Sequence, residues 1–156
     1  MTCKERMEKY LRDNGVSFQS MTHPEVYTAQ EVAAAQHVPG KQLAKVVMVL
    51  ADGEMVMLVL PASYRVDFKK LAAFLGAKKV RLAKEEEFGD IFPDCELGAM
   101  PPFGNLYDLP VYADNAFDDD ADIVFQVGTH RDTMKIRYAD FTRLAQPTVG
   151  EFAVHL

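Results

Sequence analysis

The chain has 156 residues, of which 49% are hydrophobic and 26% are charged, and its formal net charge is −6. The length predicts one domain over residues 1–156 and leaves no room for a synthetase catalytic core with an appended module. The composition excludes disordered, collagen-like and disulfide-scaffold chains, and the acidic balance argues against a protein that binds DNA or RNA in general.

Helix and strand patterns alternate at the start of the chain. The pattern Thr-x-x-Glu, typical of a capping box, occurs at residues 2–5 and again at residues 28–31. The first predicted helix ends at Gly15 and the second ends at Pro39, because glycine and proline terminate helices. Between them, residues 16–21 alternate between apolar and polar side chains, which predicts a half-buried strand.

The clearest local pattern is a hairpin. Two apolar runs, residues 46–51 and 54–60, flank Asp52 and Gly53, which form the sequence of a two-residue type I′ turn. Both runs are apolar at nearly every position. We therefore expect central strands that are covered on both faces.

A helix that begins after Asp67 and ends at Gly76 follows the hairpin, then a short strand at residues 80–82 and a short helix at residues 84–88. Residues 89–108 are rich in glycine and proline, which predicts irregular structure. Three further strands are predicted, over residues 109–113, 123–127 and 133–138.

The last predicted element is a short helix capped by Asp140. Helices and strands are interspersed, and some strands are joined by tight turns. The predicted fold class is therefore α+β, or mixed α/β, rather than a doubly wound parallel sheet. We expect a curved, mixed, mostly antiparallel sheet of about six or seven strands with helices packed against it.

Conventional catalytic and membrane motifs are absent from the sequence. No serine lies in a Gly-x-Ser-x-Gly pattern, the four histidines form no metal-binding pattern, and the two cysteines are far apart. No glycine-rich nucleotide motif occurs, so we expect no metal and no cofactor. The N-terminus has no apolar signal segment, and the longest apolar runs fall short of the ~20 residues of a membrane span. We expect a cytoplasmic protein with no membrane partner.

Charge is distributed unevenly along the chain. Residues 41–84 contain nine basic and three acidic side chains, whereas residues 85–122 contain twelve acidic side chains and no basic one. The basic block is compatible with one face for a localised anionic ligand. Ordinary solvated helix faces are the alternative interpretation.

Three local features are candidates for a binding site. Lys45 stands where a polar loop enters an apolar strand and could reach a phosphate, or could simply extend into solvent from the strand end. Residues 98–104 could present backbone N–H groups to a ligand carbonyl, or could form only a rigid turn. His130 follows another apolar strand, where it could donate a hydrogen bond or titrate, or could lie in a surface turn.

Taken together, these features resemble the YbaK-type editing domains associated with prolyl-tRNA synthetase. The resemblance covers about residues 15–145 and rests on four motifs in a fixed order. They are the run from His23 and Tyr27 to Ala33, residues 44–49 around Lys45, Gly98-x-x-x-Pro102 with Phe103-Gly104, and Gly128-Thr129-His130 followed by residues 138–141.

The resemblance implies a free-standing hydrolase that deacylates mischarged aminoacyl-tRNA in trans. The expected substrate is a small amino acid on proline tRNA, with alanine, serine, threonine and cysteine all open. The expected partners are the acceptor end of the tRNA and, as a further option, prolyl-tRNA synthetase. Family members are thought to use the 2′-hydroxyl of the terminal adenosine to help activate water, which agrees with the missing protein nucleophile.

The resemblance also implies roles for particular residues. Lys45, Gly98 and His130 are expected to be catalytic: Lys45 anchors the acceptor end, the loop at Gly98 positions the ester through backbone groups, and His130 lines the pocket. The residues expected to bind substrate are Ala99, Met100, Pro101, Pro102, Phe103, Gly128 and Thr129.

Two other functions are compatible with the sequence. A non-catalytic module of the same fold would bind a nucleotide or an RNA end without turnover. A regulatory protein-interaction domain that has lost activity would show no RNA property that depends on Lys45. The oligomeric state is left open.

Overall fold

Five α-helices form, at positions close to those that the sequence predicts. The structure is a computed structural model that describes residues 1–156. The helices are α1 (Cys3–Asp13), α2 (Ala29–Ala35), α3 (Phe68–Leu75), α4 (Glu85–Phe88) and α5 (Tyr138–Ala145). Both predicted capping boxes are present: the hydroxyls of Thr2 and Thr28 each accept a hydrogen bond of 3.1 Å from the N–H of the glutamate three residues later. None of the helices combines the length and hydrophobicity that crossing a bilayer requires.

Ten strands form three sheets. They are β1 (Gln19–Thr22), β2 (Ala44–Ala51), β3 (Glu54–Pro61), β4 (Tyr64–Val66), β5 (Val80–Leu82), β6 (Val111–Asp114), β7 (Asp122–Gln126), β8 (Asp132–Arg137), β9 (Thr148–Gly150) and β10 (Ala153–His155). The orders are β5-β2-β3-β6-β9 and β1-β8-β7, and β4 pairs with β10. Only the β3–β6 and β6–β9 pairs are parallel.

This arrangement confirms the α+β class with mostly antiparallel pairing. The strands beyond the expected six or seven are β4, β9 and β10, each of three residues. The sequence analysis predicts no strand at these three segments. They form through pairing with partners that lie far away in the chain.

The β2–β3 hairpin is the longest paired element, and it forms as predicted. Its register runs from Ala44 opposite Pro61 to Ala51 opposite Glu54. The turn residues Asp52 and Gly53 have φ values of 49° and 84°, which is the left-handed conformation that a type I′ turn requires at both positions. The two strands lie between β5 and β6, so they are central strands, as expected.

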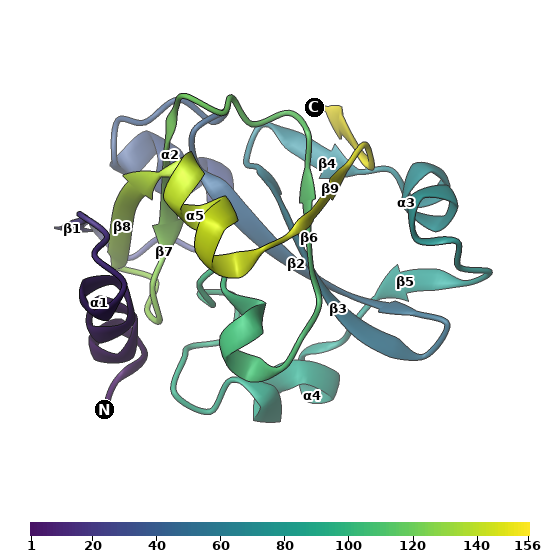
Figure 1. Ribbon diagram of the computed structural model, residues 1–156, viewed down its shortest axis with the longest axis horizontal. Helices are drawn as coiled ribbons and strands as arrows, with labels where there is room; N and C mark the ends of the chain where they lie inside the picture. Colours follow the sequence, from purple (N-terminus) through teal and green to yellow (C-terminus); the bar gives the residue numbers. More distant parts are fainter.

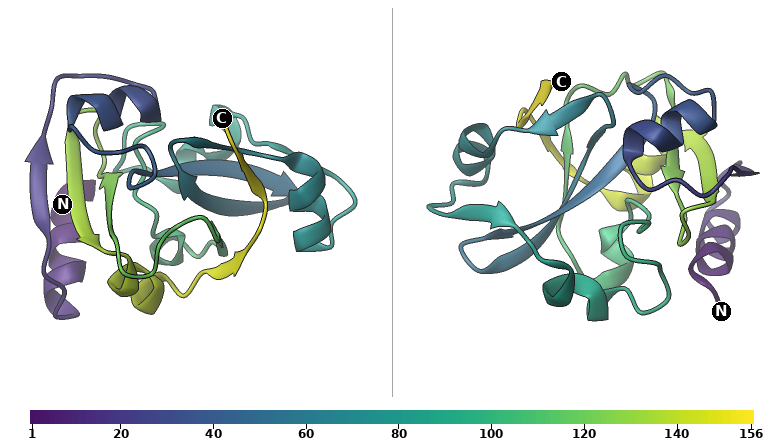
Figure 2. Two further views of the ribbon diagram at one scale, coloured as in Figure 1. Left: turned by 90° about the horizontal axis from the view of Figure 1, so that it is seen from above. Right: turned by 180° about the vertical axis from the view of Figure 1, so that it is seen from behind.

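The two larger sheets meet at the start of β2. A parallel bridge joins Leu43 to Val124 of β7, and the Val124 N–H donates a hydrogen bond of 2.9 Å to the carbonyl of Gln42. The three-stranded sheet stands at one end of the molecule beside α1 and α2, and α3 lies at the other end (Figure 1). Two further views show the same separation (Figure 2).

The hydrophobic core has three parts. The largest cluster contains 22 buried residues from α1, α5 and both large sheets. Smaller clusters of seven and five residues include Leu71 of α3 and Val32 of α2. Side chains in and directly before β2 therefore pack into different clusters: Met48 belongs to the first, Val49 to the second and Leu43 to the third.

One predicted helix boundary is wrong. Asp140 does not cap α5, because the N-cap residue is Arg137 and the helix begins at Tyr138. Strand β8 runs directly into the helix, which leaves no loop for a capping side chain. Asp140 instead lies in the first turn, 3.4 Å from the guanidinium of Arg143, where a negative charge favours the helix N-terminus.

Candidate functional site

Two segments that are far apart in the sequence are tied together by backbone hydrogen bonds. They are residues 95–99, here called the Gly98 segment, and residues 127–131, here called the β7–β8 turn. Gly128 of the turn makes both hydrogen bonds to the Gly98 segment. Its carbonyl accepts from the Glu96 N–H and its own N–H donates to the Ala99 carbonyl, both at 2.8 Å. The fold therefore brings together two of the motifs that the sequence singled out.

His130 packs against the Gly98 segment. Its side chain is 9% exposed, and its backbone N–H donates to the Glu96 carboxylate at 3.1 Å. Its Nε2 atom lies 3.0 Å from the carbonyl oxygen of Leu97. A Cβ atom at Gly98 would lie 3.5 Å from Cε1 of His130, and Gly98 has a φ of +87° that favours glycine. Glycine is favoured here by the backbone conformation, because a Cβ at 3.5 Å would make only an ordinary contact with the imidazole.

The hydrogen bonding of His130 leaves one ring nitrogen unused. The Leu97 carbonyl only accepts, so Nε2 carries the proton and donates it. In the neutral imidazole Nδ1 is then an acceptor, and this buried atom has no hydrogen-bond partner. The ring of Tyr27 lies across the imidazole with 4.6 Å between the centroids. His130 therefore has a buried acceptor that no group of the protein satisfies.

Lys45 is the second residue of β2 and is half-buried. The bridge between Leu43 and Val124 sets β2 beside β7. Because side chains alternate along strands, Lys45 lies on the same side of β2 as Leu43, and Gln126 lies on the same side of β7 as Val124. Burial lowers the pKa of Lys45, and no charged partner opposes that shift. A partly desolvated ammonium without a protein counterion suits an anionic ligand such as a phosphate.

Two more buried polar atoms without hydrogen-bond partners lie at the end of the three-stranded sheet that contains the β7–β8 turn, namely Nε2 of His23 and Nε2 of Gln126. His23 is 7% exposed, and its backbone N–H donates to Arg131 in the β7–β8 turn at 2.9 Å. Gln126 pairs with Thr133 directly after that turn. Buried polar atoms are nearly always paired, so the unpaired atoms of His23, Gln126 and His130 make this the candidate region for a ligand.

Reasoning from the sequence missed Gln126. The signal that could reveal it is a polar side chain between Phe125 and Val127 in a strand that is otherwise apolar. The face of the sheet on which that side chain lies depends on the register of β7 against β8, which the sequence does not reveal. His23 and Tyr27 belong to a motif of the family resemblance, yet the sequence alone assigns them no role in the site.

Most residues of the expected substrate loop are buried: Ala99, Met100, Pro101, Pro102 and Phe103. Phe103 is fully buried, and its ring contacts Phe125 and Phe141 in the core. The Gly98 N–H donates only to the Met100 sulfur, at 3.2 Å. Because a thioether is a weak acceptor, this N–H is available to a stronger one. Within this loop, the backbone of Gly98 is thus the group best placed to meet a ligand.

Gly128 and Thr129 shape the β7–β8 turn. Gly128 has a φ of +90°, and a Cβ atom there would lie 2.6 Å from Cβ of Cys3, so glycine allows the start of α1 to pack against the turn. The Thr129 hydroxyl donates to Asp132 at 2.7 Å and accepts from the N–H groups of Arg131 and Asp132. A direct contact of either residue with substrate stays a prediction.

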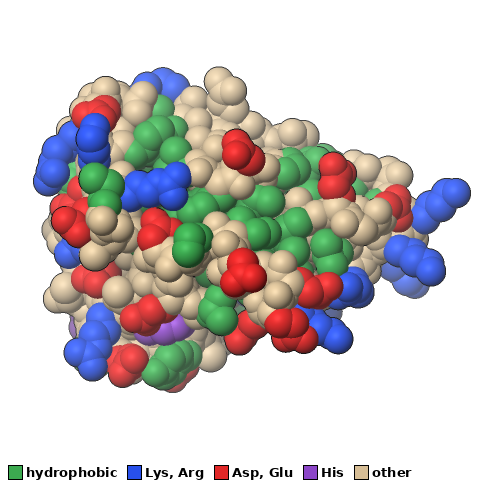
Figure 3. Space-filling model, turned by 90° about the horizontal axis from the view of Figure 1, so that it is seen from below, with side chains coloured by type: hydrophobic (Ala, Val, Ile, Leu, Met, Phe, Trp, Pro, Cys, Tyr) green, Lys and Arg blue, Asp and Glu red, His purple; other side chains and the backbone are tan.

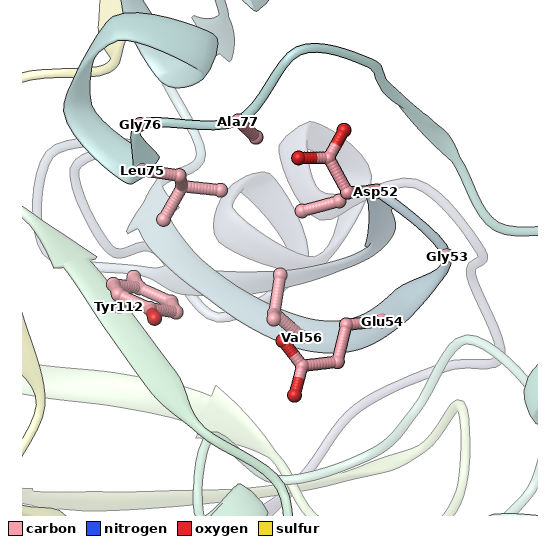
Figure 4. Close-up of a pocket in the computed structure, with 9 residues that line it drawn as sticks. Asp52, Gly53, Glu54, Val56, Leu75, Gly76, Ala77 and Tyr112 are labelled. Carbon is pink, nitrogen blue, oxygen red and sulfur yellow. The ribbon is translucent and has the colours of Figure 1, made fainter.

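Lys45 is not joined to Gly98 or His130 by any hydrogen bond or ion pair, and these three residues do not line the larger cavities. One cavity of about 300 Å³ lies at the tip of the β2–β3 hairpin, between Asp52 and Tyr112 (Figure 4). The Asp52 carboxylate already accepts hydrogen bonds of 2.8 to 3.1 Å from backbone N–H groups of the segment before β5. That cavity is therefore explained by the local structure of the turn.

Charged side chains are also separated in space. A groove of about 630 Å³ lies between α3 and β5, and we call it the basic groove; its charged lining includes Lys69, Lys78, Lys79 and Arg81. On the face that contains α4, acidic side chains lie across the middle, whereas Lys and Arg side chains project at the two ends (Figure 3). Four of the nine basic residues in the block at 41–84 thus line one groove.

Most of the chain matches a known protein family. Residues 23–144 match the family described as the aminoacyl-tRNA editing domain. The multifunctional Ser/Thr-tRNA deacylase ProXp-y of Escherichia coli (strain K12) is 28% identical, over 95% of this chain and 91% of its own length. The proline–tRNA ligase of Staphylococcus saprophyticus is 32% identical over 77% of this chain, which corresponds to 20% of the ligase.

Solved structures share the fold over almost the whole chain. A candidate trans-editing enzyme for prolyl-tRNA synthetase superimposes with a TM-score of 0.83 at 20% identity, over 99% of this chain and 98% of its own. The hypothetical protein APE2540 superimposes with a TM-score of 0.84 at 17% identity, over 96% and 99% of the two chains. At these identities the likeness concerns the fold alone.

Proposed function

This chain belongs to the aminoacyl-tRNA editing domain family, and we propose that it hydrolyses, in trans, the ester that links a small amino acid to a mischarged tRNA. The proposed site comprises Lys45, the Gly98 segment and His130. Its chemistry requires no attacking side chain, because water can be activated with the help of the 2′-hydroxyl of the terminal adenosine.

The hydrogen bond from His130 to the carbonyl of Leu97, directly before Gly98, is the observation that carries this proposal. The Gly98 N–H is held only by a thioether, so it can donate to the ester carbonyl, on which negative charge develops during hydrolysis. Nδ1 of His130 is unpaired, so it can accept from the attacking water or from the ribose hydroxyl. The Lys45 ammonium can neutralise a phosphate of the acceptor end.

The small size of the amino acid follows from the limits of selection by a synthetase. A synthetase cannot strongly reject an amino acid that lacks one methylene, because that difference is worth only ~1–3 kcal/mol. A second site that hydrolyses the smaller product corrects the error. The E. coli relative is named a Ser/Thr-tRNA deacylase, so we propose serine and threonine esters first, followed by alanine and cysteine. Because part of a proline–tRNA ligase also matches, proline tRNA is the proposed carrier.

The proposed partner is the acceptor end of aminoacyl-tRNA, and we extend the proposal to docking on prolyl-tRNA synthetase in the cytoplasm. The basic groove includes Leu50, five residues after Lys45 along β2. Strand residues rise by about 3.3 Å each, so roughly 17 Å separate the two positions. A phosphate backbone that enters the site at Lys45 can therefore continue toward the basic groove.

A deacylation screen tests this function. Purified protein is incubated with a panel of tRNAs charged with serine, threonine, alanine or cysteine, and the release of amino acid is followed over time. We expect turnover of at least one of these substrates and no release of proline from correctly charged tRNA. Binding of the acceptor end without release would instead identify a non-catalytic module. A protein that neither binds the acceptor end nor releases amino acid would contradict the proposal.

A further inference from the structure

Cys3 and Cys95 lie next to each other, although they are 92 positions apart in the sequence. Their sulfur atoms are 2.6 Å apart. Cys3 is the first residue of α1 and is buried, whereas Cys95 is in the Gly98 segment and is partly exposed. Both residues line a cavity of about 450 Å³, through which a small thiol reagent can reach Cys95.

We propose that Cys3 and Cys95 form a reversible disulfide when the protein meets a small-molecule disulfide, and that this bond locks the Gly98 segment to the start of α1. The proposal does not depend on the editing function, since it rests on the two thiols and their surroundings alone.

The geometry favours a sulfur–sulfur bond over a metal site. Asp94 would be the third ligand of a metal held by the two cysteines. Its carboxylate already accepts from the Tyr107 hydroxyl at 3.1 Å and lies 3.6 Å from the Arg6 guanidinium, whose charge opposes a cation. Two thiolates on a tetrahedral zinc ion with bonds of 2.3 Å would be about 3.8 Å apart, whereas these sulfurs are 2.6 Å apart.

The two thiols differ in reactivity. The hydrogen bond between the two sulfur atoms lowers the pKa of Cys95, so Cys95 supplies the attacking thiolate. Contact with Cys95 and burial both raise the pKa of Cys3, which keeps Cys3 protonated until the second step.

The reaction is a pair of thiol–disulfide exchanges. The Cys95 thiolate attacks one sulfur of the small disulfide, whose sulfur–sulfur bond breaks, and one thiolate leaves. Cys3 then loses its proton and attacks the Cys95 sulfur, so that the second small thiolate leaves. The two cysteines together lose two protons and two electrons, and one small disulfide is reduced to two thiols.

The position of the bond ties it to the Gly98 segment and the β7–β8 turn. Cys95 directly precedes Glu96, which bonds to the backbone of both Gly128 and His130. Cys3 packs against Gly128 from the other side, where only a glycine fits. A disulfide therefore links the start of α1 to the Gly98 segment, with the β7–β8 turn held between them. It prevents the Gly98 segment from separating from α1.

Oxidation of the full-length protein with oxidised glutathione tests the proposal. We expect the number of titratable thiols to fall from two to none and the intact mass to fall by about 2 Da. Peptide mapping should recover Cys3 linked to Cys95. The melting temperature should rise on the order of 10 °C, because the bond closes a loop of over ninety residues in the unfolded chain. A reductant should reverse all of these changes.

Cys95→Ser is the matched control, since it replaces the partly exposed cysteine and leaves the buried one in place. This variant should show no change in mass or melting temperature under the same conditions. Glutathione adducts on both cysteines of the wild type, or disulfides only between chains, would overturn the proposal. So would reduced protein that retains zinc and thereby resists oxidation.

Discussion

At the scale of single residues, Lys45 is a position where the fold keeps an unfavourable burial of charge, and Gly98 is a position where any side chain would be strained. Lys45 is a half-buried cation whose pKa is lowered by burial with no charge to compensate it. Gly98 has a left-handed backbone conformation against the ring of His130. Unfavourable local features persist where they serve a ligand. Substitutions here should therefore affect turnover more than folding.

Lys45→Met should abolish most of the deacylation while the melting temperature stays the same or rises. Methionine retains an unbranched side chain and removes the cost of desolvating the ammonium. The measurement is the turnover rate at subsaturating tRNA together with a thermal melt. Lys9→Met is the matched control, because Lys9 is exposed on α1 and pairs only with Asp13. A Lys45→Met protein with wild-type turnover would remove Lys45 from the site.

Gly98→Val should lower turnover by at least ~10²-fold, the size of effect seen when one oxyanion-hole donor is lost, because the strained backbone no longer holds its N–H in place. A β-branched residue strains the positive φ and places its side chain against His130. The control is Gly15→Val, since Gly15 has a similar φ of +69° but no other atom lies within 4 Å of the position that a Cβ would take there. Gly15→Val should lose stability and keep its turnover per folded molecule. Equal loss of turnover in both variants would mean that strain, rather than position, explains the effect.

At the scale of elements, the sequence predicts what is local and misses what depends on pairing. The β2–β3 hairpin is encoded by two apolar runs around Asp52 and Gly53, and α1 is encoded by its capping box. Strands β4, β9 and β10 exist only because distant partners pair with them. Their own residues show no strand pattern, so the sequence alone does not predict them.

The candidate site shows the same division. Lys45, Gly98 and His130 could be named because each is conspicuous in its own segment and belongs to a motif of the resemblance. The bond between His130 and the Leu97 carbonyl could not be foreseen, because it depends on how the β7–β8 turn docks on the Gly98 segment. The burial of Phe103 in the core was hidden for the same reason.

A contact between the basic groove and tRNA, as proposed, would make the affinity for tRNA depend on salt. Each phosphate contact on a single strand contributes about 0.7 to the slope of log affinity against log salt concentration. Replacing Lys78 and Lys79 together with alanine should lower that slope by about 1.4 if both contact phosphates. Binding measured at several salt concentrations gives the slope for the wild type and the double variant. An affinity that does not change with salt would exclude the groove as a tRNA contact.

At the scale of the whole molecule, the two large sheets are joined by one core. The cluster of 22 buried residues includes Met57 of β3, Ile136 of β8 and Phe141 of α5. We propose on this basis that residues 1–156 act as one domain and unfold in one transition. Tyr138 lies in the same cluster, 5.1 Å from Phe117 between ring centroids, and can report on the stability of the whole.

Stability should fall at alkaline pH because of Tyr138. Burial raises the pKa of its hydroxyl to about 12 in the folded protein, whereas an unfolded tyrosine titrates near ~10. The contribution of the neutral side chain is thus fully present below pH ~10 and is lost as the pH rises toward ~12. Tyr138→Phe should lose less stability over this interval. The free energy of unfolding in urea at several pH values measures this, and identical pH profiles for the two proteins would contradict it.

The most direct test of the proposed mechanism is the rate at which the wild-type protein releases the amino acid from a mischarged tRNA whose terminal adenosine lacks its 2′-hydroxyl. In this mechanism the substrate hydroxyl activates water and the Gly98 backbone positions the ester, with no protein nucleophile. Rapid release from the normal substrate and no release from the 2′-deoxy substrate are therefore expected. Hydrolysis of both at the same rate, together with loss of activity in a single variant at Ser17, Ser20, Ser63, Cys3 or Cys95, would contradict it.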